Sequence, residues 1–205
     1  MKLYWHPFSV FPRRVQIALR EKGLPCEEVV VDLPGGGLRT PSFRRLNPFA
    51  QVPVLEDGDL VVAESIAILE YLEDRYPSPP LLPPDAARRA IVCQLMLWSG
   101  DYFAPAWKAW MAPRFSPDVS PGDVSVAHGR AAMAAHLDVL DARLGTADWL
   151  VETYSLADVC YAPFVTVLDV LGLGDLLAAR PAVESWVRRL AARPAVRDTA
   201  PPLSV

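Results

Sequence analysis

The stretch VPVLEDGDLVVAES, residues 52–65, carries the clearest structural pattern in the chain. Two apolar runs flank Asp57 and Gly58, and an Asp-Gly pair in that position is typical of a type I′ hairpin turn. We therefore expect two antiparallel strands joined at this pair. Ser65 follows the second run after Glu64, at a position where a serine commonly caps a helix, and Pro77 ends the helical pattern that follows.

The segment before this hairpin has the pattern of a βαβ unit. Residues 3–6 form a short apolar run, and the helical pattern after it has Pro12 in its first turn and ends at Gly23. The run CEEVVVDL, residues 26–33, is typical of a second strand. Two strands joined by a helix of this length pair in parallel. The expected order is therefore βαβ, a short helix, then ββα.

The segment after the hairpin marks a domain boundary. The stretch PSPPLLPP, residues 77–84, interrupts all periodicity and is typical of a linker. From Asp85 to Arg197 only helical periodicity remains. We therefore predict an α/β domain over residues 1–78, a linker over 79–84 and an all-α domain over 85–205.

The composition argues against several kinds of partner. A net charge of −4 predicts no binding of nucleic acid or of an anionic membrane surface. Asp101 and Lys108 interrupt the most aromatic run, so no membrane span is expected. The three cysteines are far apart, as is typical of reduced thiols in the cytoplasm. The three histidines lack metal-ligand spacing, so we expect no metal.

Three stretches give the chain a resemblance to a known family. They are RRVQIALREKGLPCEEVVVDL, PSFRRLNPFAQVPVLEDGDLVVAESIAILEYLEDRYP and YSLADVCYAPF, beginning at residues 13, 41 and 154. In these the chain resembles the cytosolic glutathione S-transferases, in particular the serine-using, theta- or phi-like bacterial members. The resemblance implies a thioredoxin-like N-terminal domain followed by an all-helical domain. It also implies a homodimer that uses glutathione as co-substrate, without metal or nucleotide, against a small electrophilic apolar substrate.

The resemblance assigns the catalytic role to Ser9. In serine-using members a serine stands five residues before the Arg of an Arg-Val pair, as Ser9 stands before Arg14. A hydroxyl at the start of a helix can donate a hydrogen bond to the glutathione sulfur, and the helix dipole also favours a negative charge there. Tyr4 is the alternative, because other classes use a tyrosine hydroxyl, but it falls within the first strand.

The same resemblance places the glutathione contacts along the hairpin. Pro53 matches the family's cis-proline, which leaves the Val52 main chain to pair with the cysteinyl part of the tripeptide. Gln51 is expected to contact the glycine end, and Glu64 with Ser65 to bind the γ-glutamyl end at a helix N-terminus. These residues are Gln51, Val52, Pro53, Glu64 and Ser65.

Two charged residues complete the expected glutathione site. Arg39 aligns with a basic residue that binds the glycyl carboxylate, although Leu38 replaces the family's histidine before it. Asp101 resembles an acid that reaches across the dimer to the glutathione amino group. Each has a structural alternative, Arg39 as a solvated loop charge and Asp101 as a solvated helix charge.

The second-substrate pocket is predicted from aromatic and sulfur side chains. The expected lining residues are Phe8, Phe11, Trp107 and Met111, although the spacing of the last two also suits ordinary core. Phe11 replaces the cysteine of the maleylacetoacetate isomerase branch, which argues against that activity. By contrast, the spacing of Ser155 and Asp158 is that of a capping box, with a structural role.

Two other functions stay open at this point. One is a non-catalytic binding or interaction protein with the same fold, which commonly lacks the thiol-activating hydroxyl or the Glu-Ser pair. The other is a glutathione-dependent isomerase or peroxidase, which shares the first chemical step. The chain keeps both Ser9 and the Glu64-Ser65 pair, and this favours a transferase.

Overall fold

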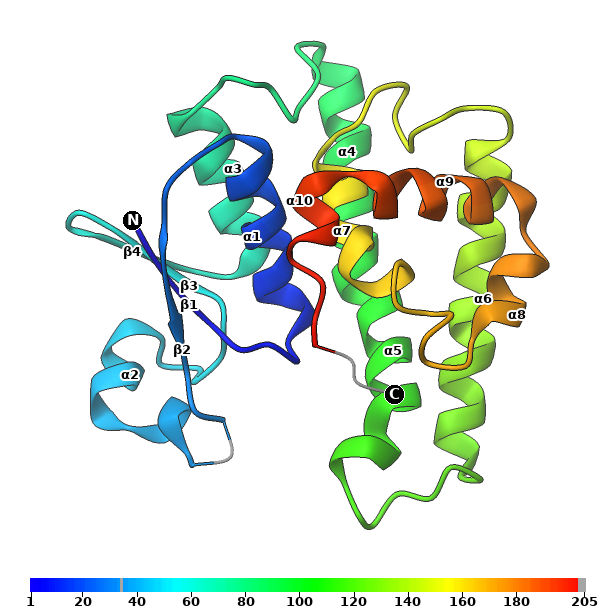
Figure 1. Cartoon of the computed structure of the whole chain (residues 1–205), viewed down its shortest axis with the longest axis horizontal. Coiled ribbons are helices and arrows are strands. Elements are labelled where there is room, and N and C mark those ends of the chain that lie inside the picture. Colours follow the sequence, from blue (N-terminus) through cyan, green and yellow to red (C-terminus); the bar gives the residue numbers. More distant parts are fainter. Residues whose placement is uncertain (34, 203–205) are drawn as a thin grey trace. The chain divides into compact units, whose positions relative to one another are not determined.

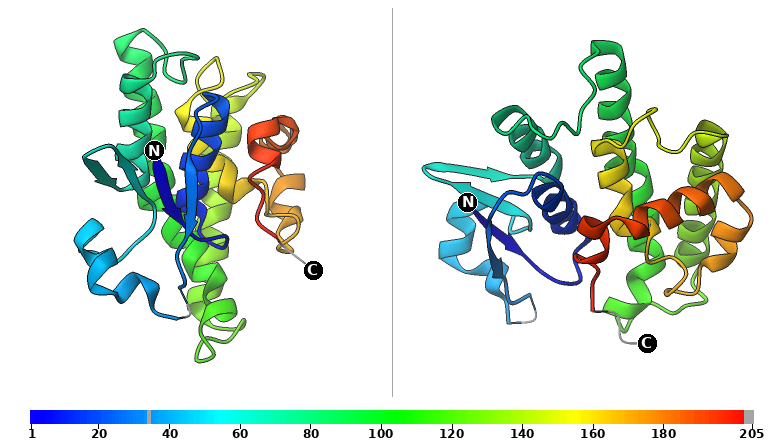
Figure 2. Two further views of the ribbon diagram at one scale, coloured as in Figure 1. Left: turned by 60° about the vertical axis from the view of Figure 1, so that its left-hand side comes forward. Right: turned by 45° about the horizontal axis from the view of Figure 1, so that its top comes forward.

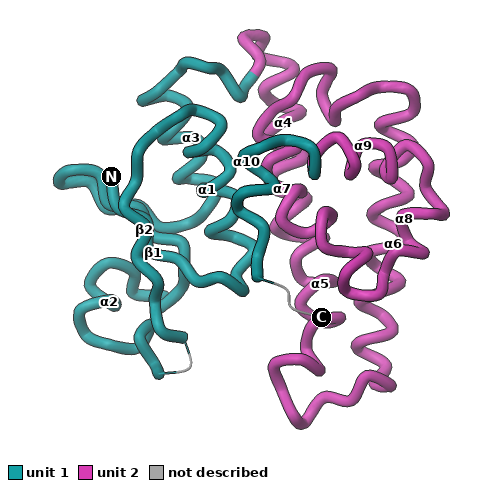
Figure 3. Tube along the Cα trace, viewed as in Figure 1, with its two compact units in different colours: residues 1–82, 191–205 teal, residues 83–190 magenta. Residues whose placement is uncertain are grey.

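The chain folds into two compact units, which Figure 3 distinguishes by colour. The computed structural model describes residues 1–33 and 35–202. The first unit holds residues 1–82 together with the chain from Ala191 onward, and the second holds residues 83–190. The boundaries drawn from the sequence stay a prediction. The chain from Ala191 groups with the first unit, whereas the sequence pattern assigns it to the all-α domain.

The first unit is built on a four-stranded mixed sheet in the order β2-β1-β3-β4 (Figure 1). The strands are β1 (Lys2–Trp5), β2 (Glu27–Val30), β3 (Val54–Asp57) and β4 (Leu60–Ala63). β1 pairs in parallel with β2 and antiparallel with β3, and β3 pairs antiparallel with β4. The predicted βαβ unit and hairpin are therefore confirmed, and with them the thioredoxin-like fold class.

Helices cover both faces of this sheet, which Figure 2 shows from two further sides. The helices are α1 (Val10–Glu21), α2 (Pro41–Leu46) and α3 (Ser65–Arg75). Because side chains alternate along a strand, Leu3 and Leu55 pack with buried residues of α1 and α3. Val54, adjacent to Leu55, instead packs with Phe43 of α2 on the opposite face.

The hairpin turn differs by one residue from the expectation. Asp57 pairs with Leu60 as the last residue of β3, so the turn residues are Gly58 and Asp59. Gly58 has a φ of 62°, whereas Asp59 is not among the residues with positive φ. A positive φ at the first turn position alone is typical of type II′, in which glycine takes that position. The prediction of a hairpin is thus confirmed, and the type I′ turn centred on Asp57-Gly58 is wrong.

A buried ion pair joins α1, α3 and the segment that follows α3. The Lys22 side chain is 0% exposed, and its Nζ lies 2.6 Å from Oε2 of Glu73. Lys22 also donates to the carbonyl oxygens of Tyr76 and Pro79, while Glu73 accepts from the main-chain N–H groups of Leu81 and Leu82. The polar atoms of both side chains are therefore satisfied away from water.

The second unit is helical. Its elements are α4 (Ala86–Trp98), the π-helical segment η2 (Ser99–Phe103), α5 (Ala104–Phe115), α6 (Val124–Leu144), α7 (Leu156–Val165), α8 (Gly174–Ala178) and most of α9 (Pro181–Ala192). α5 and α6 pack closely at Gly129, where a Cβ atom would lie 2.7 Å from the carbonyl oxygen of Ala106. Among the described residues, none of the helices is both long enough and apolar enough to cross a membrane.

α7 begins at the predicted capping box. The main-chain N–H of Ser155 donates to Oδ2 of Asp158 at 2.9 Å, which confirms the reciprocal arrangement expected of this pair. Asp158 also accepts from the indole N–H of Trp186 at 2.8 Å and from the N–H of Leu150. Although these donors favour the carboxylate, burial raises its pKa to about 6. Through the bond from Trp186, Asp158 also connects α7 to α9.

Residues 193–197 pack on α1, the first helix of the first unit. α10 (Pro194–Arg197) contacts α1, and a guanidinium nitrogen of Arg13 donates to the carbonyl oxygen of Val196 at 3.1 Å. Arg193 and Glu21 form a two-point ion pair with both N···O distances at 2.7 Å. Such paired hydrogen bonds are geometrically specific, so the segment that contains α10 is anchored on α1.

Candidate functional site

Ser9 is the N-cap residue of α1, and its hydroxyl does not cap the helix. Its main-chain N–H donates to the carbonyl oxygen of His6 at 3.0 Å, and its backbone is extended, but its side chain makes no capping hydrogen bond. The first turn of α1 contains no acidic residue. The half-buried hydroxyl therefore lies at the positive end of a helix dipole without a bond to the helix itself.

Tyr4, the alternative to Ser9, is already engaged within the sheet. Its hydroxyl donates to Oε2 of Glu56 at 2.7 Å, across the pairing of β1 with β3. Burial, followed by the bond to Glu56, raises the pKa of Tyr4 to about 12. A phenol with its proton held by a carboxylate is a poor donor to a second anion, so the geometry favours Ser9.

The N-terminus of α3 is linked to α1 through Arg14. A guanidinium nitrogen of Arg14 donates to Oγ of Ser65 at 3.3 Å, and both side chains are buried. Ser65 is the first residue of α3, so the prediction that it caps the helix is wrong. The N-cap is Glu64, whose φ of 74° and ψ of 118° are unusual for a residue with a side chain. Such local strain is often found at binding sites.

The loop before β3 is shaped by Asn47. The side-chain amide of Asn47 donates to the carbonyl oxygen of Gln51 at 2.9 Å, and its Oδ1 accepts from the N–H of Phe49. The Val52–Pro53 peptide bond is cis, as predicted. Among the described residues, no main-chain hydrogen bond is made to either polar group of Val52. The loop therefore presents a main-chain donor and acceptor, with the exposed side chain of Gln51 next to them in sequence.

The two charged residues of the predicted site, Arg39 and Asp101, do not take part in the hydrogen bonds described above. Arg39 is exposed at the end of a 3₁₀ turn, η1 (Gly37–Arg39), and no hydrogen bond or ion pair of the described chain joins it to the residues above. Asp101 is exposed in η2 and belongs to the second unit. Their roles stay predictions.

The predicted pocket residues are divided between the two units. Phe8 is 58% exposed, and the guanidinium of Arg14 lies 4.9 Å from the ring centroid of Phe11. In the second unit Trp107 packs edge-on against Phe164 with 5.5 Å between centroids, and Met111 is half-buried on α5. The packing of Trp107 suits the core alternative. A role in substrate binding stays a prediction for all four.

Sequence reasoning missed Arg14 and Asn47 as residues that shape the site. Arg14 served only as a marker for Ser9, yet an arginine on an otherwise apolar helix face indicates a buried polar partner. Asn47 precedes Pro48, and an Asn-Pro pair is a turn signal. The partner of Arg14, Ser65, is 51 positions away in the chain, which no local pattern indicates.

The first unit thus contains several groups that suit the binding of an anionic, peptide-like ligand. These groups are the N-termini of α1 and α3, a serine hydroxyl and an unpaired stretch of main chain at Val52. Helix N-termini bind carboxylates and thiolates, and an unpaired main-chain edge can bind an extended peptide. Within the described part of the chain, no cluster of three or more histidine, cysteine or acidic residues is suited to hold a metal ion.

Comparisons with known proteins agree with this description. The family model "Glutathione S-transferase, N-terminal domain" matches residues 3–80, and "Glutathione S-transferase, C-terminal domain" matches residues 123–189. Glutathione S-transferase 3 of Zea mays is 35% identical over 97% of this chain and 92% of its own. FtsZ-localized protein A of Caulobacter vibrioides is 33% identical over 95% and 88%. The structure of glutathione S-transferase-I bound with lactoylglutathione has a TM-score of 0.87 and 28% identity, with 97% of each chain covered.

Proposed function

Since this chain belongs to the glutathione S-transferase family and is a glutathione transferase, we propose that the Ser9 hydroxyl holds the sulfur of bound glutathione as a thiolate. The observation that carries the proposal is the position of Ser9 at the N-cap of α1 with its hydroxyl not used for capping. In this mechanism the hydroxyl donates to the sulfur, and the thiolate attacks a small electrophilic apolar substrate. Binding of both substrates side by side lowers the entropic part of the barrier.

The required stabilisation is modest. A free thiol with a pKa of about 8.5 is ionised only to a few per cent at pH 7, and a pKa lower by about two units makes the thiolate the main form. The corresponding free energy is about 2.7 kcal/mol. A hydrogen bond to a charged acceptor contributes about 1.5–3 kcal/mol and a helix terminus about 0.3–1 kcal/mol, so the two together are sufficient.

The remaining glutathione contacts follow the chemistry of each group. The free main-chain groups of Val52, before Pro53, suit the cysteinyl part of the tripeptide, and Gln51 suits the glycine end, with Arg39 for its carboxylate. Ser65, at the N-terminus of α3, suits the γ-glutamyl carboxylate. Arg14 then acts as a positioning residue, because its bond to Ser65 fixes where that hydroxyl lies.

The proposal includes a cytoplasmic homodimer in which Asp101 contacts the glutathione amino group of the partner subunit. Asp101 lies in the π-helical segment η2, and such segments are frequent at functional sites. It is also flanked in sequence by the exposed apolar side chains of Leu97 and Tyr102. Apolar surface of this kind is typical of an interface between subunits.

Ser9→Ala tests the role of the hydroxyl. We expect the variant to bind glutathione about as well as the wild type, since the binding groups lie elsewhere. Its bound thiol should titrate about one pH unit or more higher, which is about 1.4 kcal/mol of lost thiolate stabilisation. Turnover near neutral pH should fall at least tenfold and partly recover at higher pH. Ultraviolet titration of the bound thiolate and steady-state rates with an electrophilic substrate measure these effects.

Tyr4→Phe is the matched control for this experiment. It also removes one hydroxyl near the start of the chain, but that hydroxyl is bonded to Glu56. We expect the pKa of the bound thiol to be unchanged in this variant. An unshifted thiol pKa in Ser9→Ala, or an equal shift in Tyr4→Phe, would refute the assignment of Ser9.

A second candidate function is suggested by FtsZ-localized protein A, whose name describes association with another protein. In this second function the chain keeps the glutathione site and serves mainly as an interaction module. Calorimetry with millimolar glutathione, followed by a screen of electrophiles, distinguishes the two functions. Binding with turnover supports the transferase, whereas binding without turnover of any electrophile supports the interaction module.

A further inference from the structure

Two turns of the first unit are built in the same way. One is His-Pro-Phe-Ser, residues 6–9, and the other is Asn-Pro-Phe-Ala, residues 47–50. In each turn the main-chain N–H of the fourth residue donates to the carbonyl oxygen of the first, at 3.0 Å in residues 6–9 and at 2.9 Å in residues 47–50. Proline takes the second place in both, which it favours in β-turns. The first turn presents Ser9 at the start of α1, and the second leads to Gln51 and Val52.

The side chain of the first residue closes each of these turns a second time. The main-chain N–H of Phe8 donates to Nδ1 of His6 at 3.3 Å, and that of Phe49 donates to Oδ1 of Asn47 at 3.0 Å. An asparagine that accepts from the N–H two residues later forms an Asx turn, a common way to fix such a loop. The ring nitrogen of His6 therefore takes the place that the amide oxygen of Asn47 has in the second turn.

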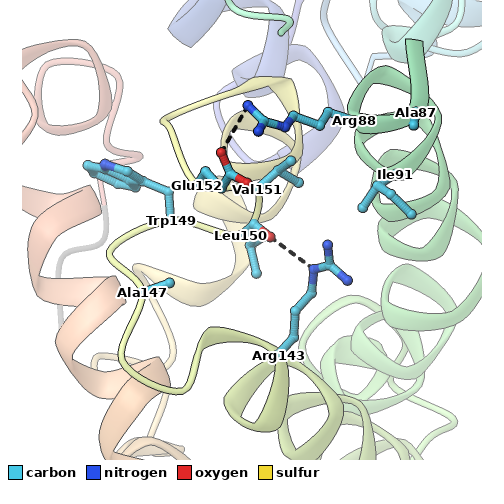
Figure 4. A pocket seen from close by; sticks show the side chains of 9 residues that line it. All are labelled: Ala87, Arg88, Ile91, Arg143, Ala147, Trp149, Leu150, Val151 and Glu152. Carbon is cyan, nitrogen blue, oxygen red and sulfur yellow. Dashed lines mark hydrogen bonds and ion pairs between the residues drawn. The ribbon is translucent and has the colours of Figure 1, made fainter. Parts of the chain in front are cut away.

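A tight turn of the second unit is held differently. The N–H of Thr153 donates to the carbonyl oxygen of Val151, and Glu152 lies between them. Glu152 lines a cavity of about 550 Å³, and Figure 4 shows its carboxylate directed toward Arg88 of α4, at 2.9 Å from a guanidinium nitrogen. A side chain at a turn of this chain can thus bind another element. The use of the His6 ring within its own turn is therefore not a consequence of turn geometry alone.

His6 can accept from Phe8 only while its Nδ1 carries no proton. A neutral imidazole has one N–H and one acceptor nitrogen, so this bond requires the proton on Nε2. Burial lowers the pKa of His6 from its usual value of 6.5, and Asp32, just after β2, is the charged group that raises it in opposition. Burial is the larger effect, so the neutral ring is the main form at neutral pH. The imidazolium has an N–H at both nitrogens and cannot hold the turn.

We propose that neutral His6 is a positioning residue, which holds the Ser9 hydroxyl in place for the glutathione thiolate by accepting from the N–H of Phe8. The inference rests on the proposed function of Ser9, because His6 itself takes no part in the chemistry. Two bonds join His6 to the turn, one from Phe8 to its ring and one from Ser9 to its carbonyl oxygen. Protonation removes the first, so Ser9 is held less firmly as the pH falls below about 6.5. The turn at Asn47 has no such pH dependence, because an amide does not titrate in this range.

Nitrogen-15 NMR of the free protein tests the bond without glutathione. At pH 7.5 we expect Nδ1 of His6 to be unprotonated and Nε2 to carry the proton. Below about pH 6.5 the main-chain amide signal of Phe8 should shift with pH in the wild type. In His6→Asn it should stay constant, because asparagine supplies an acceptor that does not titrate. A proton on Nδ1 at pH 7.5, or the same titration of Phe8 in both proteins, would overturn the proposal.

Two variants of His6 test the effect on the bound thiol, measured by ultraviolet titration. His6→Leu removes the acceptor, so its bound thiol should titrate about 0.5–1 pH unit higher, with an affinity for glutathione within about threefold of the wild type. His6→Asn should recover at least half of that shift, since Asn47 makes the same bond in its own turn. The control is His128→Leu, at an exposed histidine of α6, and it should leave the thiol pKa unchanged. Equal shifts in His6→Leu and His6→Asn, or no shift in His6→Leu, would overturn the proposal.

The double variant His6→Leu with Ser9→Ala separates this proposal from the proposed function. If His6 acts through Ser9, the bound thiol of the double variant should titrate at the same pH as that of Ser9→Ala alone. A further rise would show that His6 acts on the thiol without Ser9, and would overturn its positioning role. An unshifted thiol pKa in Ser9→Ala refutes the proposed function of Ser9. A shift in Ser9→Ala without one in His6→Leu refutes only the role of His6.

Discussion

Lys22 shows how strongly one residue can determine the stability of the first unit. Its ammonium group is fully buried, and its partner Glu73 also binds the main chain at Leu81 and Leu82. Removal of one partner of a buried pair leaves an uncompensated charge, which typically costs about 3–5 kcal/mol. Replacement of both partners by apolar residues is often nearly neutral. The pair therefore stabilises the fold mainly because each partner neutralises the buried charge of the other, and less through the attraction between them.

Lys22→Met should therefore lower the free energy of unfolding by about 3–5 kcal/mol, measured by urea denaturation. Lys22→Met with Glu73→Gln should recover at least half of that loss, because no buried charge remains and the amide oxygen can still accept from the N–H groups of Leu81 and Leu82. The control is Arg20→Met, which breaks the partly exposed Arg20–Glu28 pair and should cost less than about 1 kcal/mol. Equal losses in Lys22→Met and Arg20→Met would contradict this account.

Individual residues could be predicted from the sequence where a local motif defines them. Ser155 and Asp158 three positions apart were sufficient to predict the capping box, and the structure confirms it. Lys22 and Glu73 could not be paired in this way, because they are 51 positions apart and look like ordinary surface charges of two helices. Partnership between distant polar residues depends on the packed fold, which no local pattern contains.

At the scale of elements, His136 connects α6 to α7. Its Nε2 lies 2.7 Å from the hydroxyl of Tyr161, and its ring packs edge-on against Phe103 with 5.3 Å between centroids. Burial lowers the pKa of His136 to about 4. Because the folded pKa lies below the unfolded value of about 6.5, the protonated histidine favours the unfolded chain. Stability from this group is present above pH 6.5 and is lost as the pH falls toward 4.

His136→Gln should thus make the protein less sensitive to acid. At pH 7.5 we expect the variant to be less stable than the wild type, since the packing of the ring is lost. Between pH 7.5 and pH 5 that difference should shrink by about 1 kcal/mol, with allowance for partial solvent exposure of the ring. Urea denaturation at both pH values measures it. Asp158 titrates in the same range with the opposite sign, but it is present in both proteins and cancels.

Elements were easier to predict than their ends. The strands and the hairpin follow from periodicity and an Asp-Gly pair. The turn, however, lies one residue later than predicted, and of its two residues only Gly58 has a positive φ. The N-cap of α3 also differs by one residue from the prediction. Ser65 is the residue that usually caps a helix, yet its hydroxyl accepts from Arg14, and the N-cap position is taken by Glu64. A long-range contact thus prevailed over a local preference.

At the scale of the molecule, the proposed homodimer is the main expectation. Sedimentation equilibrium at micromolar concentration should give twice the 22.5 kDa mass of one chain. Leu97→Glu places a charge on the exposed apolar end of α4 and should shift the protein toward monomer. The control is Val139→Glu, which puts the same charge at an exposed position of α6 outside the expected interface and should leave the dimer intact. A monomeric wild type would contradict the expectation and remove the role of Asp101 across subunits.

The sequence predicts a division of the chain into two parts, whose boundaries stay a prediction, but it does not indicate the unit on which residues 191–202 pack. The proline-rich stretch and the change of periodicity indicate the boundary near residue 80. Nothing in a short helical pattern after residue 191 indicates which unit it packs on. That choice depends on the Arg193–Glu21 pair and on the bond from Arg13 to Val196.

The return of α10 to α1 has a consequence for the order in which the protein is made. Ribosomes synthesise a chain from its N-terminus, so the sheet and α1 emerge first. Arg193, which pairs with Glu21, follows 172 positions later, after the whole helical unit. The first unit therefore begins to fold earliest and is completed last. During most of synthesis, the surface of α1 that receives α10 lacks its native cover, and a chain that terminates before Arg193 never obtains it.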